Sequence, residues 1–341
     1  MKKYLAFVLI STFCVIGSAE AQVSGLTKTG LSAATFLEIE VGPRSKGMGG
    51  AFVGVADDVS ALYWNPAGIA TLQENSFMFS HSERFAAINF DFAGATFKLG
   101  NFGSVGAFIT SLTMPDQEVR TVEQPEGTGN FFGANDLALG LSYGRYLTDR
   151  FAIGANFKFI RESIFNSSAN TVAVDFGTLF RTGLNDMVIG FSLSNFGGDL
   201  KLSGTDTQVE VDISPNEFGN NDRIFANLET EDFQLPLIFR VGVGMNVLNT
   251  ENNRALIAVD AVVPNDNAQF VNVGGEYVIG NILSLRAGYR TLFLEDSEEG
   301  VTLGAGLKYE LFGETTLQFD YSYGDFGLLD NVQEFALSIY F

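Results

Sequence analysis

From about residue 76 onward, the chain alternates between apolar side chains and polar or small ones. In a β-strand, successive side chains point to opposite faces of the sheet, so this pattern predicts strands with one apolar face. The clearest example lies between residues 150 and 162, where the two alternating sets are Phe151, Ile153, Ala155, Phe157 and Phe159, and Ala152, Gly154, Asn156 and Lys158. The same alternation recurs at 301–310 and 317–324. We therefore predict an all-β protein.

The alternating segments are separated by short and longer connections in turn, which is typical of bacterial outer-membrane barrels whose short turns face the periplasm. We predict a transmembrane barrel of about fourteen antiparallel strands over residues 76–341. A change of phase at Ala93 and Gly94 predicts a bulge in the second strand. The predicted strands are 76–81, 87–99, 103–112, 135–146, 150–162, 170–182, 186–195, 235–248, 253–263, 268–279, 282–292, 300–311, 314–325 and 331–341.

The second face of the predicted strands carries glycine, serine and isolated charges, which suits a narrow lumen better than the packed interior of a soluble sandwich. The charges expected to face the lumen are Asp91, Lys158, Asp175, Arg240, Asp260, Glu276, Arg286, Arg290, Lys308, Glu310 and Asp320. They are spread over many strands and have both signs. Two interpretations are open: an ion-pair network that holds a plug, or a path for polar solutes.

Both ends of the chain carry export signals. Lys2 and Lys3 precede an apolar run, and Ala19-Glu20-Ala21 is a small-x-small cleavage site, so residues 1–21 are predicted to be a signal peptide. The last predicted strand has one apolar face that ends on an aromatic residue and resembles the signal read by outer-membrane insertion machinery. This face consists of Phe335, Leu337, Ile339 and Phe341. We expect the protein in the outer membrane of a Gram-negative bacterium, in contact with membrane lipid.

The composition of the chain limits the classes of ligand and partner that it can bind. The formal net charge is −20, which argues against nucleic acid and anionic phosphate ligands because these need a basic surface. After the predicted signal peptide, no apolar run approaches the roughly 20 residues of a membrane helix. Cys14, the one cysteine, lies within the predicted signal peptide, so neither disulfides nor thiolate metal sites are expected. No cofactor is expected either.

The stretch 46–70, KGMGGAFVGVADDVSALYWNPAGIA, is rich in glycine and suggests a nucleotide-binding loop at first sight. A dinucleotide fingerprint needs G-x-G-x-x-G, but Phe52 stands where the third glycine is required, and no GK[ST] follows. Packing is the better interpretation: Gly49 and Gly50 would let the backbone approach the barrel wall closely. Asp57 or Asp58 is expected to cap a short helix near 59–64.

This same stretch resembles the N-terminal signature of the FadL-like outer-membrane barrels, and more closely that of their PorV/PorQ branch, which is found with the type IX secretion system. In FadL-like proteins the N-terminal region plugs the barrel. The resemblance therefore implies that residues 22–75 form a plug. The matching positions are Met48, Gly49, Gly50, Ala51, Asp57, Asp58, Trp64, Asn65, Pro66, Ala67 and Gly68.

Two further features of the sequence are candidate sites. His81 lies between Ser80 and Ser82, but neighbouring residues on a strand point to opposite faces, so they cannot assemble a catalytic triad among themselves. The long predicted loop 196–234 is strongly acidic. It would either bind a protein partner through Asp222, Glu229, Glu231 and Asp232, or simply be solvated. Calcium is a weaker interpretation because the loop lacks EF-hand spacing.

Two functions follow as hypotheses, neither of them enzymatic. The resemblance to PorV implies a barrel that binds the C-terminal domains of secreted cargo proteins and contacts other secretion components. The alternative is a FadL-type channel for hydrophobic small molecules such as long-chain fatty acids.

Overall fold

The computed structural model describes residues 29–184, 186–214, 216, 219, 223–295, 297–311 and 315–341. The predicted signal peptide, Cys14 and Asp222 lie outside these residues.

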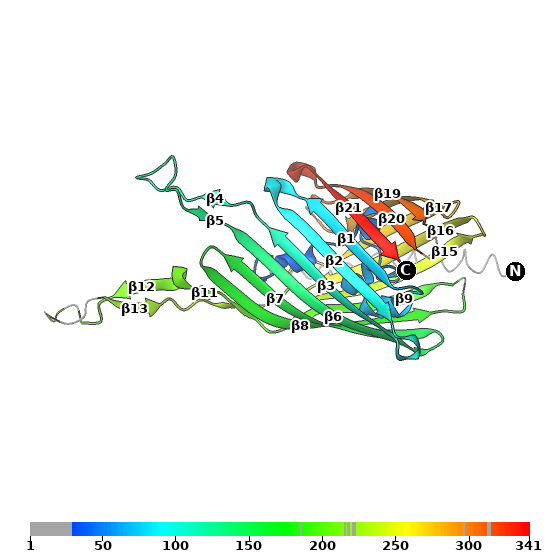
Figure 1. Ribbon diagram of the computed structural model, residues 1–341, viewed down its shortest axis with the longest axis horizontal. Helices are drawn as coiled ribbons and strands as arrows, with labels where there is room; N and C mark the ends of the chain where they lie inside the picture. The colour runs from blue at the N-terminus through cyan, green and yellow to red at the C-terminus, as the bar shows by residue number, and fades with distance from the viewer. Residues whose placement is uncertain are drawn as a thin grey trace.

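Fourteen strands of the described chain form one closed antiparallel barrel (Figure 1). Neighbours in the barrel are mostly neighbours in sequence, and β21 closes the ring against β1 through pairs such as Phe79 with Leu337. The predicted all-β, fourteen-stranded fold is thereby confirmed. The strands are β1 (Ser76–Glu83), β2 (Asn89–Lys98), β3 (Ser104–Thr113), β6 (Ala134–Thr148), β7 (Phe151–Ile164), β8 (Ser167–Arg181), β9 (Val188–Gly197), β15 (Ile238–Asn249), β16 (Asn253–Pro264), β17 (Phe270–Ile279), β18 (Leu283–Leu292), β19 (Val301–Glu310), β20 (Thr316–Asp325) and β21 (Asn331–Tyr340).

Long connections extend from one end of the barrel and short turns close the other (Figure 1). Because short turns face the periplasm in such barrels, the end that carries the C-terminus is periplasmic. One turn there holds η4 (Gly100–Phe102). The extracellular connections contain η3 (Phe85–Ala87), β4 (Gln117–Glu118), β5 (Phe131–Phe132), β10 (Leu200–Lys201), β11 (Ser203–Gly204), η5 (Thr205–Thr207), β12 (Gln208–Val211), β13 (Ile224–Asn227), β14 (Asp232–Phe233) and η6 (Gly327–Leu329).

The outer surface of the barrel explains the alternating pattern. Large apolar side chains such as Phe157, Leu303 and Phe319 are about half exposed on it, as expected for a face in contact with lipid. The predicted insertion residues lie on this face too: Phe335, Leu337 and Phe341 are exposed and Ile339 is half-buried. The localisation in the outer membrane follows from this closed barrel. Among the described residues, no helix has the length and apolar character needed to cross a membrane.

The predicted bulge at Ala93 and Gly94 is wrong. Strand β2 pairs with both neighbours without a shift in register, and Phe90 and Phe92 point into the barrel. The change of phase arises because this part of the wall packs against apolar residues of the N-terminal segment rather than against polar groups. Asp91 consequently points outward, not into the lumen as predicted.

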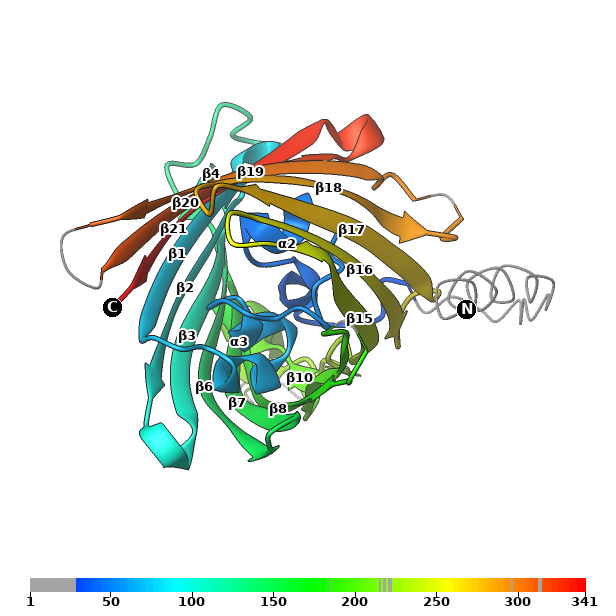
Figure 2. The same cartoon turned by 90° about the vertical axis from the view of Figure 1, so that its right-hand side faces the viewer.

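The N-terminal segment, residues 29–75, lies inside the ring of strands (Figure 2). It contains η1 (Thr35–Glu38), α2 (Pro43–Gly47), α3 (Ala61–Trp64) and η2 (Pro66–Ala70). Helix α2 packs against β18–β21, whereas η2 packs against β6–β8 on the other side of the lumen. The segment therefore spans the interior from one wall to the other.

The two walls that it touches differ in chemistry. Strands β2 and β3 contribute the apolar side chains Phe90, Phe92 and Phe108, which bury Leu62 of the segment. Strands β17, β18, β20 and β21 contribute the buried charged residues Glu276, Arg286, Asp320 and Glu334. The segment is thus held by apolar contacts on β2 and β3 and by ion pairs on β17–β21.

An arginine at Phe319, on the lipid face of β20, should impair barrel assembly. A cationic side chain costs roughly 2–4 kcal/mol at the middle of the membrane and about 0–1 kcal/mol near its edges. Phe319→Arg should therefore lose the heat-modifiable migration of a folded barrel on gels. Tyr309→Arg, at the periplasmic end of β19, is the control and should fold. Normal migration of Phe319→Arg would contradict the assigned lipid face.

Candidate functional site

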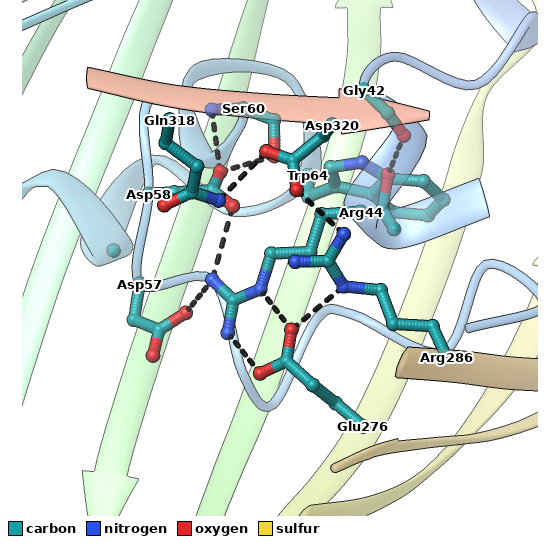
Figure 3. A network of polar contacts seen from close by, with 12 residues as sticks. Gly42, Arg44, Asp57, Asp58, Ser60, Trp64, Glu276, Arg286, Gln318 and Asp320 are labelled. Atoms are coloured by element: carbon teal, nitrogen blue, oxygen red, sulfur yellow. Dashed lines mark hydrogen bonds and ion pairs between the residues drawn. The ribbon is translucent and has the colours of Figure 1, made fainter. Parts of the chain in front are cut away.

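Arg44 lies at the centre of a buried network of charges that joins the N-terminal segment to the barrel wall (Figure 3). On the wall side, its Nε and Nη2 donate to the two carboxylate oxygens of Glu276 at 2.8 and 3.0 Å. On the segment side, its Nη1 donates to Asp57 at 2.6 Å and to Asp58 at 3.1 Å. Such two-oxygen contacts of an arginine with a carboxylate give geometric specificity as well as energy.

The wall completes what we call the Arg44 network: Arg44, Asp57, Asp58, Arg254, Glu276, Arg286 and Asp320. Arg286 bridges Glu276 at 2.8 Å and Asp320 at 2.6 Å. Arg254 adds a third cation to Glu276, also at 2.8 Å. Glu276 thus accepts from three arginines and is almost completely buried. Removing one partner from a buried ion pair leaves an uncompensated charge, which is strongly destabilising.

The network sets the protonation of the groups that the segment contributes. Burial lowers the pKa of the Arg44 guanidinium, but Asp57, Glu276 and Asp58 outweigh that effect and hold the pKa above its usual value. Burial also raises the pKa of Asp58, and Arg44 opposes this rise only in part. Asp58 is held further by Ser60, whose backbone N–H and hydroxyl both donate to its Oδ1.

Three further contacts fasten the segment to the wall. Glu334 accepts the backbone N–H of Gly42 at 2.9 Å and pairs with Lys46 at 2.6 Å. Asp260 accepts the backbone N–H groups of Phe52 and Val53, each at 2.7 Å. Arg290 contacts Glu40 at 3.0 Å and Glu299 at 2.6 Å.

Gly49 allows the backbone of the segment to touch the backbone of the wall, and Gly50 leaves room for the side chains of Glu40 and Asn272. Both have positive φ, and a methyl group added at Gly49 would lie 2.7 Å from the backbone nitrogen of Tyr289. A methyl group at Gly50 would overlap Glu40. The wall matches this with Gly274 and Gly288, where added methyl groups would collide with the backbone at 48 and 49. Glycine is therefore required on both sides of the contact.

The remaining residues of the signature are buried on the segment. The Trp64 indole N–H donates to the carbonyl of Val41 at 2.9 Å. The Asn65 amide donates to the carbonyl of Val53 at 3.0 Å and to the carbonyl of Thr178, on the adjacent strand β8, at 3.1 Å. Neither Asp57 nor Asp58 caps α3, because Arg44 and Ser60 engage their carboxylates and the cap position is Ser60. The other signature residues, Met48, Ala51, Pro66, Ala67 and Gly68, are buried beside them.

Of the charges expected to face the lumen, Glu276, Arg286 and Asp320 join the Arg44 network, and Asp260 and Arg290 bind the segment directly. Lys158 and Asp175 form a separate buried pair at 2.7 Å, and Arg240 lies over the rings of Tyr63 and Trp64 at 5.7 and 5.5 Å. Lys308 and Glu310 are exposed at the periplasmic rim. Sequence reasoning missed Arg44, Lys46 and Glu334. The signal was available in GPRSKG, which puts two cations into a segment predicted to be buried.

His81 and the acidic loop stand apart from this network. His81 Nδ1 lies 2.7 Å from Asp91 on the outer face, while Ser80 and Ser82 are buried in the lumen. Glu229, Glu231 and Asp232 are exposed on the extracellular connection between β9 and β15. Of these three acidic residues, only Glu229 lies near a described cation, with its Oε1 3.6 Å from Lys201 Nζ.

The extracellular end carries an open groove of about 400 Å³ at the tops of β7 and β8. The lining is almost entirely apolar and comes from three connections. The residues are Val119, Phe132, Ile164, Phe165, Ser167, Leu202 and Asp206. The large apolar side chain of Phe165 is half exposed to solvent. An exposed apolar concavity of this kind is a candidate binding surface.

Below the groove, apolar residues continue into the lumen. The inward faces of β6, β7 and β8 contribute Ala138, Ile160, Ala169 and Ala173, which pack with Leu200 and Leu235 of the long connection. Ala34, Phe36 and Leu37 of the N-terminal segment cover this apolar strip. At the periplasmic end, a second cavity of about 530 Å³ lies beside the segment and is lined in part by Val55, Asp57 and Arg254.

Glu38 lies where the segment meets an extracellular connection. Burial raises the pKa of its carboxyl to about 7, and the neighbouring Asp266 raises it further, whereas Arg240 and Arg290 oppose the rise. The Glu38 carboxyl therefore keeps its proton to a higher pH when η1 is docked than when the side chain is exposed to water.

Known structures share this architecture. The toluene transporter TbuX of Ralstonia pickettii superposes with a TM-score of 0.58 at 13% identity, covering 88% of this chain and 97% of its own. The CymD monoaromatic hydrocarbon channel superposes with a TM-score of 0.57 at 13% identity, covering 92% of this chain and 97% of its own. A Pseudomonas aeruginosa FadL homologue superposes with a TM-score of 0.53 at 11% identity, covering 88% of this chain and 98% of its own.

The fold is therefore that of the FadL-type outer-membrane barrels, with the N-terminal segment inside the lumen. A family model described as "Uncharacterised protein family (UPF0164)" matches residues 11–288, and the chain belongs to that family. No curated protein matches the sequence.

Glu276→Gln should release the N-terminal segment without unfolding the barrel. The substitution keeps the size of the side chain but removes the negative charge that the three arginines share. Breaking a buried ion pair costs roughly 3–5 kcal/mol. Proteolysis should then cut within residues 29–75, while heat-modifiable migration persists. Glu229→Gln removes a carboxylate from an exposed pair worth about 0–1 kcal/mol and serves as the control. Equal protease resistance in both variants would show that the network does not hold the segment.

Raising the pH should loosen the region around η1. With a folded pKa above its unfolded value, Glu38 favours the folded state most below its ordinary pKa of 4.5, and this contribution is lost as the pH rises through about 7. Protease cleavage near residues 29–40 should thus accelerate between about pH 5 and pH 8. Glu38→Gln cannot titrate and should flatten that increase. If protease cleavage rises equally with pH in the native protein and in Glu38→Gln, the pH effect belongs to another titratable group.

Proposed function

We propose that the protein is an outer-membrane transport barrel that binds apolar small molecules at its extracellular face and admits them to the lumen. The observation that carries this proposal is the open groove formed by Val119, Phe132, Ile164, Phe165 and Leu202. A groove of this size matches a small ligand, and its lining offers contact area rather than hydrogen bonds. The toluene and hydrocarbon specificity of TbuX and CymD supports the same class of ligand.

In this proposal, residues 22–75 act as a plug that must shift to let the ligand pass. The apolar strip leads from the groove down to Phe36 and Leu37, so a ligand that enters meets the segment first at its least polar part. The Arg44 network holds the other side of the segment. A small displacement around η1 would open the strip toward the periplasmic cavity while the ion pairs keep the segment attached.

The second candidate function is the capture of cargo C-terminal domains in type IX secretion, as for PorV. It rests on the N-terminal signature and on the long acidic connection, which projects from the barrel as the β12–β13 hairpin (Figure 1). Glu229, Glu231 and Asp232 lie exposed at the base of this projection. Electrostatic contacts of that kind would mainly set the rate and specificity of encounter.

One experiment separates the two functions by measuring, in the same strain, uptake of radiolabelled toluene and co-purification of secreted proteins. Phe165→Asp and Leu202→Asp place a charge in the groove and should reduce toluene uptake by roughly tenfold, because a buried apolar contact is replaced by a group that must keep its water. Val122→Asp is the matched control, since Val122 is fully exposed on the same extracellular connection as Val119 and lies outside the groove lining.

A triple variant, Glu229→Gln, Glu231→Gln and Asp232→Asn, removes charge from the long connection and should leave uptake unchanged. Unimpaired uptake in both groove variants would contradict the transport proposal. Loss of cargo capture in the triple variant would promote the secretion function instead.

A further inference from the structure

We infer that the extracellular entrance selects uncharged apolar molecules and rejects carboxylates, because three acidic residues, Asp136, Glu162 and Asp206, lie along the apolar route. The inference rests on the proposed function and defines its substrate class: neutral hydrocarbons and alcohols rather than fatty-acid anions.

The groove itself contains one charged side chain. Asp206 accepts hydrogen bonds from the backbone N–H and the amide of Asn166, at 3.0 and 3.1 Å, and from the hydroxyl of Ser167 at 3.2 Å. These three donors stabilise the carboxylate without any cation. Among the described residues that line the groove, none is cationic. A ligand carboxylate bound there would therefore lie next to an anion with nothing to neutralise it.

The step from the groove into the lumen passes two more acids. Asp136 on β6 and Glu162 on β7 are direct partners across the two strands, and both occupy the inward-facing register positions. They lie one inward position above the buried strip residues Ala138 and Ile160. Glu162 also accepts the backbone N–H of Ala34 at 2.8 Å, so it marks the point where the N-terminal segment meets the wall.

Among the described residues, no cation forms an ion pair with any of the three acids. Lys158 and Arg240 lie deeper, in a small cavity that Leu37 and Ala138 also line. Lys158, the next inward cation on β7, is buried against Asp175 at 2.7 Å and also contacts the amide of Asn195. Arg161 and Arg120 are near in sequence, but both are exposed and neither lines the groove. Like charges brought together in a partly dehydrated site repel strongly. An uncharged apolar molecule gains the contacts of the groove without this penalty.

The test uses the full-length protein in lipid nanodiscs and two photoreactive diazirine probes of equal chain length, octanol and octanoate. Each probe is irradiated with the protein at about pH 8, where the carboxylic acid is ionised, and the labelled peptides are mapped. Octanol should label the groove peptides containing Phe132, Phe165 or Leu202 at least about tenfold more than octanoate does. At about pH 4 the octanoic acid is largely neutral, and the difference should shrink.

Variants assign the discrimination to the named acids. Asp136→Asn with Glu162→Gln, and Asp206→Asn separately, should each raise octanoate labelling several-fold relative to the octanol labelling of the same variant. The separate variants matter because Asp206→Asn alters a hydrogen-bonded turn. Glu83→Gln with Glu123→Gln and Glu126→Gln is the control: it removes exposed extracellular carboxylates outside the groove, and octanoate should stay excluded.

The outcomes distinguish this inference from the function on which it rests. If neither probe labels the groove, the proposed transport function fails. If octanol and octanoate label it equally in the native protein, the function stands and the selection against carboxylates is wrong. If the control variant admits octanoate as well as the two test variants do, the effect belongs to the overall negative charge of the protein and not to these three residues.

Discussion

The interaction of Arg44 with Glu276 determines how the rest of the interior is arranged. It joins the one buried arginine of the N-terminal segment to a wall carboxylate that two other arginines also contact. Buried charges are tolerated only when they are paired and hydrogen-bonded, so α2 has few positions in which Arg44 is satisfied. Once Arg44 is placed, Met48 and Gly49 come against the glycines of β17 and β18, and η2 reaches the wall formed by β6–β8.

This arrangement divides the lumen by chemistry. Ion pairs hold α2 to β17–β21. On β6–β8, apolar packing is combined with single hydrogen bonds, from Ala34 to Glu162 and from Asn65 to Thr178. The segment is therefore held by charge on one side and mainly by apolar packing on the side below the extracellular groove.

Strand alternation predicts most of the barrel, because every strand must present apolar groups to lipid whatever lies inside it. Each lipid-facing position, such as Phe157 or Phe319, must be apolar on its own account, so it can be recognised without knowing which distant residues it contacts. The side chains that face the lumen follow no such rule. Phe90 and Phe92 point inward because Leu62 packs there, so the pattern around Ala93 suggested a bulge that does not exist. Arg44 could not be paired with Glu276 from sequence either, since their meeting depends on how a segment without regular alternation crosses the lumen.

The last strand also determines how the two ends of the barrel meet. Asn75, where the N-terminal segment passes into β1, exchanges backbone hydrogen bonds with the terminal residue Phe341 in both directions. The seam that closes the ring and the base of the segment thus share the same pair of hydrogen bonds. A change at Phe341 would therefore weaken the anchor of the segment together with the edge of β21.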